Sequence, residues 1–240
     1  MKAAVYTGTR NLYPHMVTAA KSLLKNSSVD KIYFLIEDDR FPYPVPEEIE
    51  TINVLEYLKY FPPDSANFFT KFTPICLLRA AYTKILPETL DRVLQLDVDT
   101  IVDRNIDALW DVDLTGKYFA AVPEHLGTYK PYGDKYYNVG VMMCNLHQNR
   151  SEKLDDKLIK LLNDEKMPYI DQDAWNKIGA DKAVDLDVKY NECFVTGHTS
   201  RPCIVHYAGN RNWTSNRGMD RGEYLDKYDR MTFEEIMKDK

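Results

Sequence analysis

Residues 92–103 read RVLQLDVDTIVD, and this stretch carries the feature on which both fold and site depend. Apolar residues at positions 93, 94 and 96 are typical of a buried strand. The chain then places Asp97, Asp99 and Asp103 in close succession. Burying a carboxylate without a partner is costly. A bound cation at the end of the strand would compensate these charges, so the stretch indicates a metal site.

Asp97 and Asp99 differ from the other Asp-x-Asp pairs of the chain. Three further pairs suit solvated turns or helix caps: Asp111/Asp113, Asp171/Asp173 and Asp185/Asp187. Only the pair at 97 and 99 directly follows an apolar strand. Side chains at i and i+2 of an extended segment point to the same side. Both carboxylates can therefore share one cation.

Length and composition favour one folded domain over residues 1–240. The 240 residues are 44% hydrophobic, which is enough for one sizeable core. The net charge is −6 without a long run of one sign, which argues against a nucleic-acid partner. Anionic small ligands stay compatible with this charge, because a metal and a few local cations can invert the field inside one cleft.

The sequence does not suggest a membrane protein. No run of roughly 18 or more apolar residues occurs, so we expect no transmembrane span. The N-terminal KAAVY is strand-like and lacks the features of a signal peptide. Four scattered cysteines fit buried thiols in a reducing cytosol, so we expect a cytoplasmic location. The tail from residue 220 mixes charges, which predicts a helix and no strong membrane anchor.

Strand-like and helical patterns alternate along the chain. Apolar segments typical of strands lie at 2–8, 31–37, 51–57, 92–97, 118–124, 138–146 and 202–210, the last with its strand ending at His206. Apolar residues at helical spacing predict helices at 14–25, 73–86, 151–163 and 171–179, a short helix at 106–110, and a helix start at Thr73 and Pro74.

This alternation predicts an α/β fold with a mostly parallel sheet. In such sheets, ligands bind beyond the carboxyl ends of the strands, where the strand order reverses. We therefore expect three features to share one neighbourhood: the turn at Gly8, the acidic cluster that begins at Asp97, and His206.

Two enzyme families place an Asp-x-Asp pair after a strand. The haloacid-dehalogenase-type phosphatases carry D-x-D-x-T or D-x-D-x-V on their first strand. Here Ile101 occupies the last motif position, and several strands precede the motif. The nucleotide-sugar glycosyltransferases carry the pair after a central strand. The motif alone leaves both alternatives open.

Further segments resemble glycosyltransferase family 8, which includes glycogenin and bacterial lipooligosaccharide galactosyltransferases. Residues 92–114 resemble the D-x-D core of that family with its downstream L-W/F-x-x-D, and YYNVGVMMCNL resembles its F-N-x-G-V-x-x-x-N-L strand. YIDQDAWN resembles its D-Q-D-x-x-N segment, and HYAGNRNW resembles its H-Y/F-x-G end with a later K-P-W. These segments occur in family order over about residues 3 to 213. The resemblance implies a single-domain GT-A fold: a Rossmann-like, mostly parallel twisted sheet flanked by helices.

The resemblance implies that Asp97, Asp99 and His206 hold a divalent cation. The diphosphate of a UDP-sugar donor would complete the coordination shell. Carboxylate and diphosphate oxygens suit Mg²⁺ or Mn²⁺, and an imidazole ligand favours Mn²⁺.

The resemblance also assigns residues to the UDP-sugar donor. Contacts to uracil and ribose match the turn after the first strand, at Thr7, Gly8, Thr9, Asn11 and Tyr13. Contacts to the diphosphate and the donor sugar match Lys71, Arg79, Val98, Asn138, Gly140, Asp173, Gly209 and Arg211. Arg211 stands in a segment one residue shorter than the family's K-P-W, and its guanidinium has a different geometry from a lysine.

Asp171 and Gln172 match the family residues nearest the anomeric carbon of the donor. The family retains the anomeric configuration, and a glutamine amide is a poor nucleophile. Internal return is therefore favoured, in which the leaving diphosphate accepts the acceptor's proton on the same face. Gln172 would stabilise oxocarbenium-like charge, and Asp171 or Asp173 would orient sugar hydroxyls.

The sequence thus predicts a retaining, metal-dependent transferase that moves glucose or galactose from a UDP-sugar to a glycan or another hydroxyl acceptor. A phosphatase, a non-catalytic UDP-sugar-binding module and transfer to one of the chain's own tyrosines stay open as alternatives. The acceptor, the donor sugar and a homodimeric assembly are not determined by the sequence.

Overall fold

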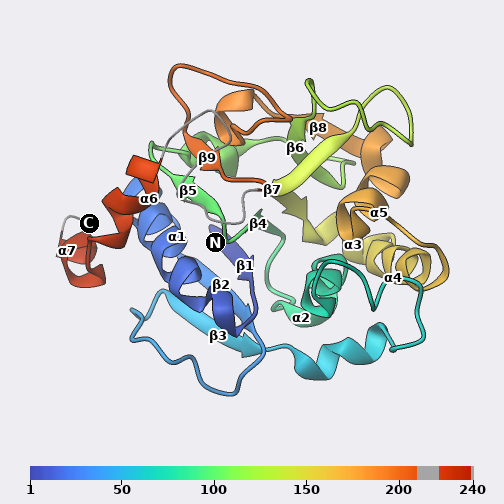
Figure 1. Ribbon diagram of the computed structural model, residues 1–240, viewed down its shortest axis with the longest axis horizontal. Helices are drawn as coiled ribbons and strands as arrows, with labels where there is room; N and C mark the ends of the chain where they lie inside the picture. Colours follow the sequence, from blue (N-terminus) through green and yellow to red (C-terminus); the bar gives the residue numbers. More distant parts are fainter. Residues whose placement is uncertain (210–221, 239–240) are drawn as a thin grey trace.

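A seven-stranded sheet forms the centre of the molecule (Figure 1). The computed structural model describes residues 1–209 and 222–238. In sheet order the strands are β3 (Ile49–Asn53), β2 (Lys31–Ile36), β1 (Ala3–Thr7), β4 (Arg92–Leu96), β7 (Tyr137–Asn145), β6 (Phe119–Pro123) and β8 (Ala183–Asp185). β7 is antiparallel to its neighbours β4 and β6, and the other neighbouring pairs are parallel. The expected mostly parallel α/β sheet is confirmed.

The strand order reverses between β1 and β4. The chain runs outward from β1 through β2 to β3 and then returns to place β4 on the other side of β1. At such a reversal the connections leave a crevice beyond the carboxyl ends of the strands. β1 ends at Thr7 and β4 ends at Leu96, so Gly8 and Asp97 both lie at this edge.

Helices cover both faces of the sheet (Figure 1). The α-helices are α1 (Tyr13–Asn26), α2 (Tyr82–Ile85), α3 (Leu146–Ser151), α4 (Leu154–Asp164), α5 (Ile170–Gly179), α6 (Gly222–Asp229) and α7 (Phe233–Lys238). Short 3-10 helices are η1 (Arg10–Leu12), η2 (Leu55–Tyr60), η3 (Pro74–Ala80), η4 (Asp107–Asp111), η5 (Ala180–Lys182) and η6 (Val188–Tyr190).

Alternate residues of β1 contribute to two different cores. Ala3 and Val5 pack with residues of η3, α4 and α5, whereas Ala4 and Tyr6 pack against α1. This is the period of two expected of a strand. Because both faces are buried, the strand is apolar throughout rather than alternating with polar residues.

A second, two-stranded sheet follows the acidic cluster. β5 (Thr100–Val102) pairs antiparallel with β9 (Ile204–His206). Helix α6 of the tail covers this pair, and Tyr228 packs with Ile101 and Val205. Asp103 accepts hydrogen bonds from Lys227 at 2.7 Å and from the Tyr228 hydroxyl at 3.0 Å. Asp103 therefore anchors the tail, while Asp97 and Asp99 stay at the sheet edge.

Several expected boundaries are corrected by the structure. The strand expected at 51–57 is β3, which starts earlier and gives way to η2. The helix expected from Thr73 is η3 followed by the short α2, and the Thr73 side chain makes no capping hydrogen bond. Within η3 the buried residues Ile75 and Leu78, and Leu77 and Ala80, are three apart, a spacing that fits a 3-10 helix as well as an α-helix, so the sequence did not separate the two.

The remaining differences concern short elements. The helix expected at 151–163 begins at Leu154, because Lys153 takes the left-handed conformation with φ of 52° and separates α3 from α4. The strand expected at 202–210 is the three-residue β9, and β5 and β8 were not expected. Three residues are too few to show an alternating pattern.

All four cysteines are free thiols: Cys144 and Cys193 are buried, and Cys76 and Cys203 are partly exposed. Across the residues that the structure covers, none of the helices combines the length and the apolar composition that a membrane crossing requires.

We predict that Asp155 makes the stability of the fold decrease as pH rises. Burial raises the pKa of Asp155 to about 6, although its Oδ2 accepts hydrogen bonds from the amide and hydroxyl of Thr83. Between pH 4 and pH 6 the folded chain holds a proton here that the unfolded chain has lost, so unfolding becomes easier as pH rises. Compared with Asp155→Asn, the wild type should lose about 2–3 kcal/mol of unfolding free energy between pH 4.5 and pH 7.5.

Urea denaturation followed by circular dichroism at each pH measures this difference. The exposed neighbour Asp156 pairs with Lys84 on the surface, so Asp156→Asn serves as the control and should leave the pH profile of the wild type unchanged. Parallel profiles for the wild type and Asp155→Asn would contradict the prediction.

Candidate active site

The turn after β1 and the turn after β4 meet at the reversal of strand order. A side chain at Gly8 would place its Cβ 2.8 Å from Met16 Sδ and 3.4 Å from Val98 Cγ1. The first distance is too short for a real contact, so the glycine lets the backbone of this turn approach helix α1 closely. Gly8 and Val98, both expected in the nucleotide site, are thus neighbours.

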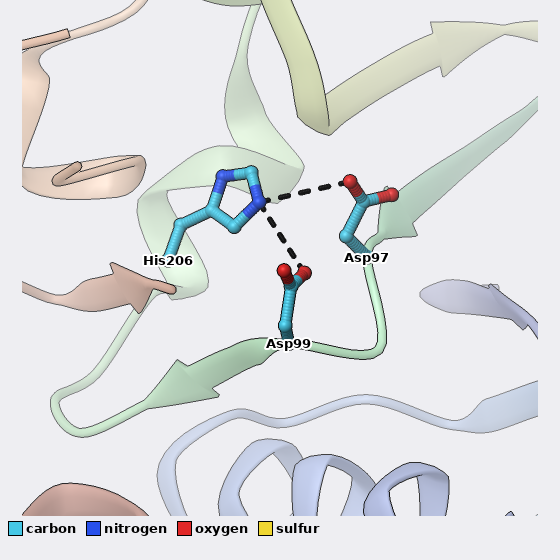
Figure 2. A group of neighbouring side chains, drawn as sticks. All are labelled: Asp97, Asp99 and His206. Atoms are coloured by element: carbon cyan, nitrogen blue, oxygen red, sulfur yellow. Dashed lines mark ion pairs between the residues drawn. The ribbon is translucent and has the colours of Figure 1, made fainter. Parts of the chain in front are cut away.

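The acidic pair lies on a tight turn between β4 and β5. The Thr100 amide donates to the Asp97 carbonyl at 3.1 Å, so the segment is a turn and not the extended continuation of the strand that the sequence suggested. Both carboxylates nevertheless point to the same side, toward His206 (Figure 2). The convergence therefore comes from the turn rather than from strand periodicity.

His206 reaches the pair through the small sheet. β9 pairs with β5 so that His206 is opposite Thr100, and the Tyr207 amide donates to the Asp99 carbonyl at 2.9 Å. His206 Nε2 lies 3.3 Å from Asp99 Oδ1 and 3.6 Å from Asp97 Oδ2 (Figure 2). One donor atom from each of the three residues lies within 4.8 Å of the others. The expected proximity of the three side chains is therefore present.

A chain of amides sets the orientation of the imidazole. Asn191 donates through Nδ2 to Asn138 Oδ1 at 2.9 Å, which leaves Asn191 Oδ1 facing His206. An amide oxygen can only accept, so His206 Nδ1 donates to it at 2.8 Å. The lone pair on Nε2 is then directed at the two carboxylates when the ring is neutral.

The charges of the three groups are strongly coupled. Burial is the largest influence on the pKa of His206 and lowers it, but Asp99 and Cys193 together raise that pKa well above the usual value. Burial raises the pKa of Asp97 more than Arg79 lowers it. For Asp99, burial is the largest influence and raises the pKa, but His206, a backbone hydrogen bond and Arg79 together lower the pKa below its usual value. Two oxygen donors and one nitrogen donor with this charge suit a divalent cation.

Gly140 leaves the space that the imidazole needs. A Cβ at this position would lie 2.2 Å from His206 Cε1 and 2.9 Å from Asp97 Oδ2. The ring and the carboxylate therefore pack directly on the backbone of β7. The tight backing holds the donor atoms in place, and the residues present fit a divalent cation.

Arg79 links the acidic pair to helix α5. From η3 its guanidinium lies 2.8 Å from Asp97 Oδ1 and 3.2 Å from Asp171 Oδ2. Gln95 supports the same carboxylate through Nε2, 3.2 Å from Asp97 Oδ1. Burial raises the pKa of Asp171 to about 6 even though Arg79 opposes the shift. The arginine is therefore shared between the buried carboxylate of Asp171 and the partly exposed carboxylate of Asp97.

Gln172 and Asn138 meet at Glu124. The amide of Val139 donates to Gln172 Oε1 at 3.2 Å, and Gln172 Nε2 donates to Glu124 Oε1 at 3.2 Å. Asn138 Nδ2 donates to the same oxygen at 3.1 Å. Glu124 is 7% exposed, and burial raises its pKa. The carboxylate therefore holds the Gln172 amide in one orientation.

Sequence reasoning missed Glu124, Gln95 and Asn191. Glu124 directly follows the apolar strand β6, just as Asp97 follows β4, so the same signal could have found it. Gln95 is a polar residue inside an apolar strand, which was a second usable signal. Asn191 lies in an irregular segment that offers none.

The remaining residues expected at the nucleotide lie around the β1 end of the crevice. The Thr7 hydroxyl is buried at the end of β1, and Thr9 donates to Asn11 Oδ1 at 2.6 Å on the exposed turn that follows. Tyr13 is 2% exposed and donates to Asp38 at 2.8 Å. Its ring is therefore part of the core.

Two further expected residues, Asp173 and Lys71, have partners within the described part of the chain. Asp173 is fully buried and bonded to tyrosines, and the ammonium of Lys71 lies 4.9 Å from the ring centroid of Tyr169. Gly209 takes a left-handed conformation with φ of 69°, which suits glycine. Arg211 falls outside the residues that the structure describes.

Together, the reversal of strand order and the acidic–imidazole group at its edge define an α/β protein with a candidate metal site at the place where ligands bind in such sheets. The family model for glycosyl transferase family 8 matches residues 4–216. The chain therefore belongs to glycosyl transferase family 8.

Curated relatives agree with this membership. Glycosyltransferase GlyB of Streptococcus pneumoniae serotype 4 is 26% identical over 239 residues, which cover 92% of this chain and 54% of that protein. A glycosyltransferase-like protein of Haemophilus influenzae is 25% identical over 210 residues, covering 78% of this chain and 62% of that protein. The chain thus spans little more than half of the length of these relatives.

Solved structures establish the fold. Glycosyltransferase GlyE of Streptococcus pneumoniae TIGR4 has a TM-score of 0.75 and 24% identity, covering 99% of this chain and 62% of that one. The galactosyltransferase LgtC, with bound donor and acceptor sugar analogues, has a TM-score of 0.73 and 18% identity, covering 98% of this chain and 99% of that one. The chain has the GT-A fold, as the resemblance implied.

We predict that Gly140→Ala weakens binding of Mn²⁺ by at least about tenfold, because the added methyl group displaces His206 and Asp97. Isothermal calorimetry with Mn²⁺ measures the affinity, and circular dichroism checks that the fold is kept. Gly116→Asn is the matched control. Gly116 has φ of 68°, which asparagine tolerates, and no described atom lies within 4 Å of the Cβ position. Equal Mn²⁺ affinity in Gly140→Ala and the wild type would contradict the prediction.

Proposed function

We propose that the chain transfers a hexose, glucose or galactose, from a UDP-sugar to an acceptor hydroxyl with retention of anomeric configuration. The observation that carries this proposal is the convergence of Asp97, Asp99 and His206 at the reversal of strand order. Names of related proteins support the hexose. LgtC is described as a galactosyltransferase, and an Escherichia coli relative, 31% identical over 121 residues, as a lipopolysaccharide 1,2-glucosyltransferase.

Asp97, Asp99 and His206 would hold the divalent cation, with Mn²⁺ favoured by the imidazole. When bound, such a cation acts as a Lewis acid that neutralises charge on a diphosphate leaving group. Asn191 keeps His206 Nε2 directed at this position, and Gly140 keeps it close. The chain thus supplies metal-ligand atoms that are already held in position, so that little rearrangement of the side chains is needed when a cation binds.

The nucleotide would lie along the edge between β1 and β4. Thr7, Gly8, Thr9 and Asn11 line the turn at its β1 end, where the uracil and ribose would bind. Val98 packs against this turn, so the base site and the cation site adjoin. Arg79, Asn138, Gly140 and Gly209 would face the diphosphate and the donor sugar.

The transfer step is written as internal return. The acceptor oxygen bonds to the anomeric carbon, the bond from that carbon to the diphosphate oxygen breaks, and the hydroxyl proton passes to the departing diphosphate on the same face. Gln172 would stabilise the positive charge that develops on the sugar ring. Double displacement would need a free carboxylate, yet Asp171 is paired with Arg79 and Glu124 accepts two amide hydrogen bonds. These contacts favour internal return.

Membership of family 8 leaves the phosphatase alternative without support. Turnover separates the proposal from a non-catalytic UDP-sugar-binding module. The mass of the protein after incubation with donor separates it from self-glycosylation.

Wild-type protein should hydrolyse at least one UDP-hexose in the presence of Mn²⁺ even without an acceptor. Asp99→Ala and His206→Ala should each lower the rate by more than about a hundredfold, because each removes a donor to the cation. A screen of UDP-glucose, UDP-galactose and their N-acetyl derivatives, followed by UDP release, measures the rates.

Asp113→Ala is the matched control for this screen. Asp113 belongs to another Asp-x-Asp pair and accepts hydrogen bonds only from Thr115 among the contacts described for it, so its loss should leave the rate unchanged. Full activity in EDTA would overturn the role of the cation. Calorimetric UDP binding without turnover would instead identify a binding module.

Retention of configuration is predicted for the same reaction. Proton NMR recorded during hydrolysis should first show the free sugar as the α-anomer, the configuration of the donor, before mutarotation mixes the two forms. Initial release of the β-anomer would exclude internal return and point to direct displacement by water.

A further inference from the structure

Helix α4 lies behind two elements that carry charged residues of the site. It packs against η3, which contains Arg79, and against α5, which contains Asp171 and lies beside it in Figure 1. Leucines of α4 share one apolar core with residues of both elements. Arg79 Nε and Asp171 Oδ2 in turn lie 3.2 Å apart. A change in the packing of α4 would therefore reach the site through either element.

One buried carboxylate of α4 holds the segment that follows η3. Asp155, in the first turn of α4, is 2% exposed. Its Oδ2 accepts a hydrogen bond from the Thr83 amide at 2.7 Å and another from the Thr83 hydroxyl at 2.6 Å. Both donors belong to one residue, so the carboxylate fixes the backbone and the side chain of Thr83 together. We call Asp155 and Thr83 the α2 clamp.

The clamp is retained at a cost in free energy. Taking a carboxylate out of water is unfavourable, and burial raises the pKa of Asp155 to about 6. An apolar side chain would avoid this cost but would leave the amide and hydroxyl of Thr83 without their acceptor. Carboxylates perturbed in this way occur preferentially at functional sites.

The clamp lies just beyond a break in the helical backbone. η3 ends at Ala80, and Ala81 has φ of −129° and ψ of 25°, outside the helical range. Thr83 follows in α2, four residues after Arg79. Since no regular helix continues across Ala81, the direction in which η3 carries Arg79 depends on the contacts of α2.

Tyr82 links the clamp to Arg79. It directly precedes Thr83 and is 1% exposed. Burial raises the pKa of Tyr82, and the Arg79 guanidinium is the largest influence against that shift, followed by the Thr7 hydroxyl. The phenol therefore lies beside the guanidinium and the end of β1. A displacement of Thr83 would move this ring and, with it, the surface on which Arg79 rests.

The contacts of the Arg79 side chain leave its position dependent on the backbone of η3. Its hydrogen bonds to Gln95 Oε1 and to the Val139 carbonyl are long, at 3.4 Å and 3.3 Å. Its shortest contact is the ion pair with Asp97 at 2.8 Å. A divalent cation on Asp97 would compete with Arg79 for the same carboxylate. With a cation bound, the placement of the guanidinium therefore rests on η3 and on what holds η3.

We propose that Asp155 is a positioning residue that acts through Thr83 and Tyr82 to hold Arg79 where it binds the diphosphate of the donor. This inference rests on the proposed function, which places the diphosphate beside Arg79. Asp155 is buried and bonded to Thr83, so it acts on the donor only through this segment. The α2 clamp thus sets the affinity for the donor from behind the site.

Isothermal calorimetry with UDP in the presence of Mn²⁺ tests the proposal without turnover. Asp155→Ala should raise the Kd for UDP by about tenfold, because Arg79 is no longer held in place. The Kd for Mn²⁺ alone should stay within about twofold of the wild type, because the clamp does not contact the acidic–imidazole group. Asp155→Asn should also bind UDP within about twofold of the wild type, since its amide oxygen accepts both hydrogen bonds of Thr83.

A double-mutant cycle shows whether the effect passes through Arg79. Arg79→Ala should weaken UDP binding by itself, and adding Asp155→Ala should weaken it by less than about a further twofold. A merely structural role of Asp155 would lower the affinity by the same factor in both backgrounds, and this additive result would overturn the inference.

Thr83→Val takes the place of Asp155→Ala in the cycle if circular dichroism shows that the alanine variant does not fold. It removes the hydroxyl and keeps the shape, so the Kd for UDP should rise about threefold, and Thr83→Ser should bind UDP as the wild type does.

Asp156→Ala is the matched control. Asp156 is the next residue of α4 and also pairs with α2, through Lys84 at 2.6 Å, but its side chain is 57% exposed. Its loss should leave the Kd for UDP unchanged. Equal Kd values for UDP in Asp155→Ala and the wild type would contradict the inference, and so would failure of the wild type to bind UDP.

The two proposals fail separately. UDP binding by the wild type without Mn²⁺-dependent hydrolysis of any UDP-hexose refutes the proposed function, and the cycle then still tests the clamp. Hydrolysis by the wild type together with additive effects in the cycle refutes the inference alone.

Discussion

The pairing of β5 with β9 is the constraint on which the site depends. These two strands have only three residues each, yet they bring together parts of the chain that are far apart in sequence. His206 lies opposite Thr100, directly beside the turn that carries Asp99. A shift of one residue would turn the imidazole to the other face of the small sheet. Helix α6 packs on the pair through Tyr228 and so helps hold this register.

The charges around the site are arranged in two linked groups. Asp97 divides its carboxylate between them, with Oδ2 toward His206 and Oδ1 toward Arg79. Arg79 in turn reaches Asp171, whose pKa stays raised to about 6 because burial outweighs the arginine. Three carboxylates, of which that of Asp171 is buried and those of Asp97 and Asp99 are partly exposed, thus face one guanidinium and one imidazole. This excess of negative charge attracts a further cation, and it couples the position of Arg79 to whatever binds Asp97 and Asp99.

Much of this arrangement could be predicted from sequence, because it depends on strand ends. An apolar strand followed by Asp97 and Asp99 places carboxylates at the edge of a sheet, and family motifs place His206 beside them. The amide that orients the imidazole could not be predicted in the same way. Asn191 acts through its position in an irregular segment, and the register of β5 and β9 has no signal in three residues. The 3-10 form of η3 was hidden as well, because its apolar spacing also fits an α-helix.

Two Asp-x-Asp pairs at one site behave differently because their backbones differ. Asp97 and Asp99 lie on a turn and converge on the same imidazole. Asp171 and Asp173 lie on the first turn of α5, where residues two apart point in different directions. Asp171 accordingly faces Arg79, and Asp173 faces the tyrosines. Gln172, between them, bonds Glu124 and Val139. The helix therefore sends three consecutive side chains into three environments, so that one short segment connects Arg79, Glu124 and the hydroxyl of Tyr136.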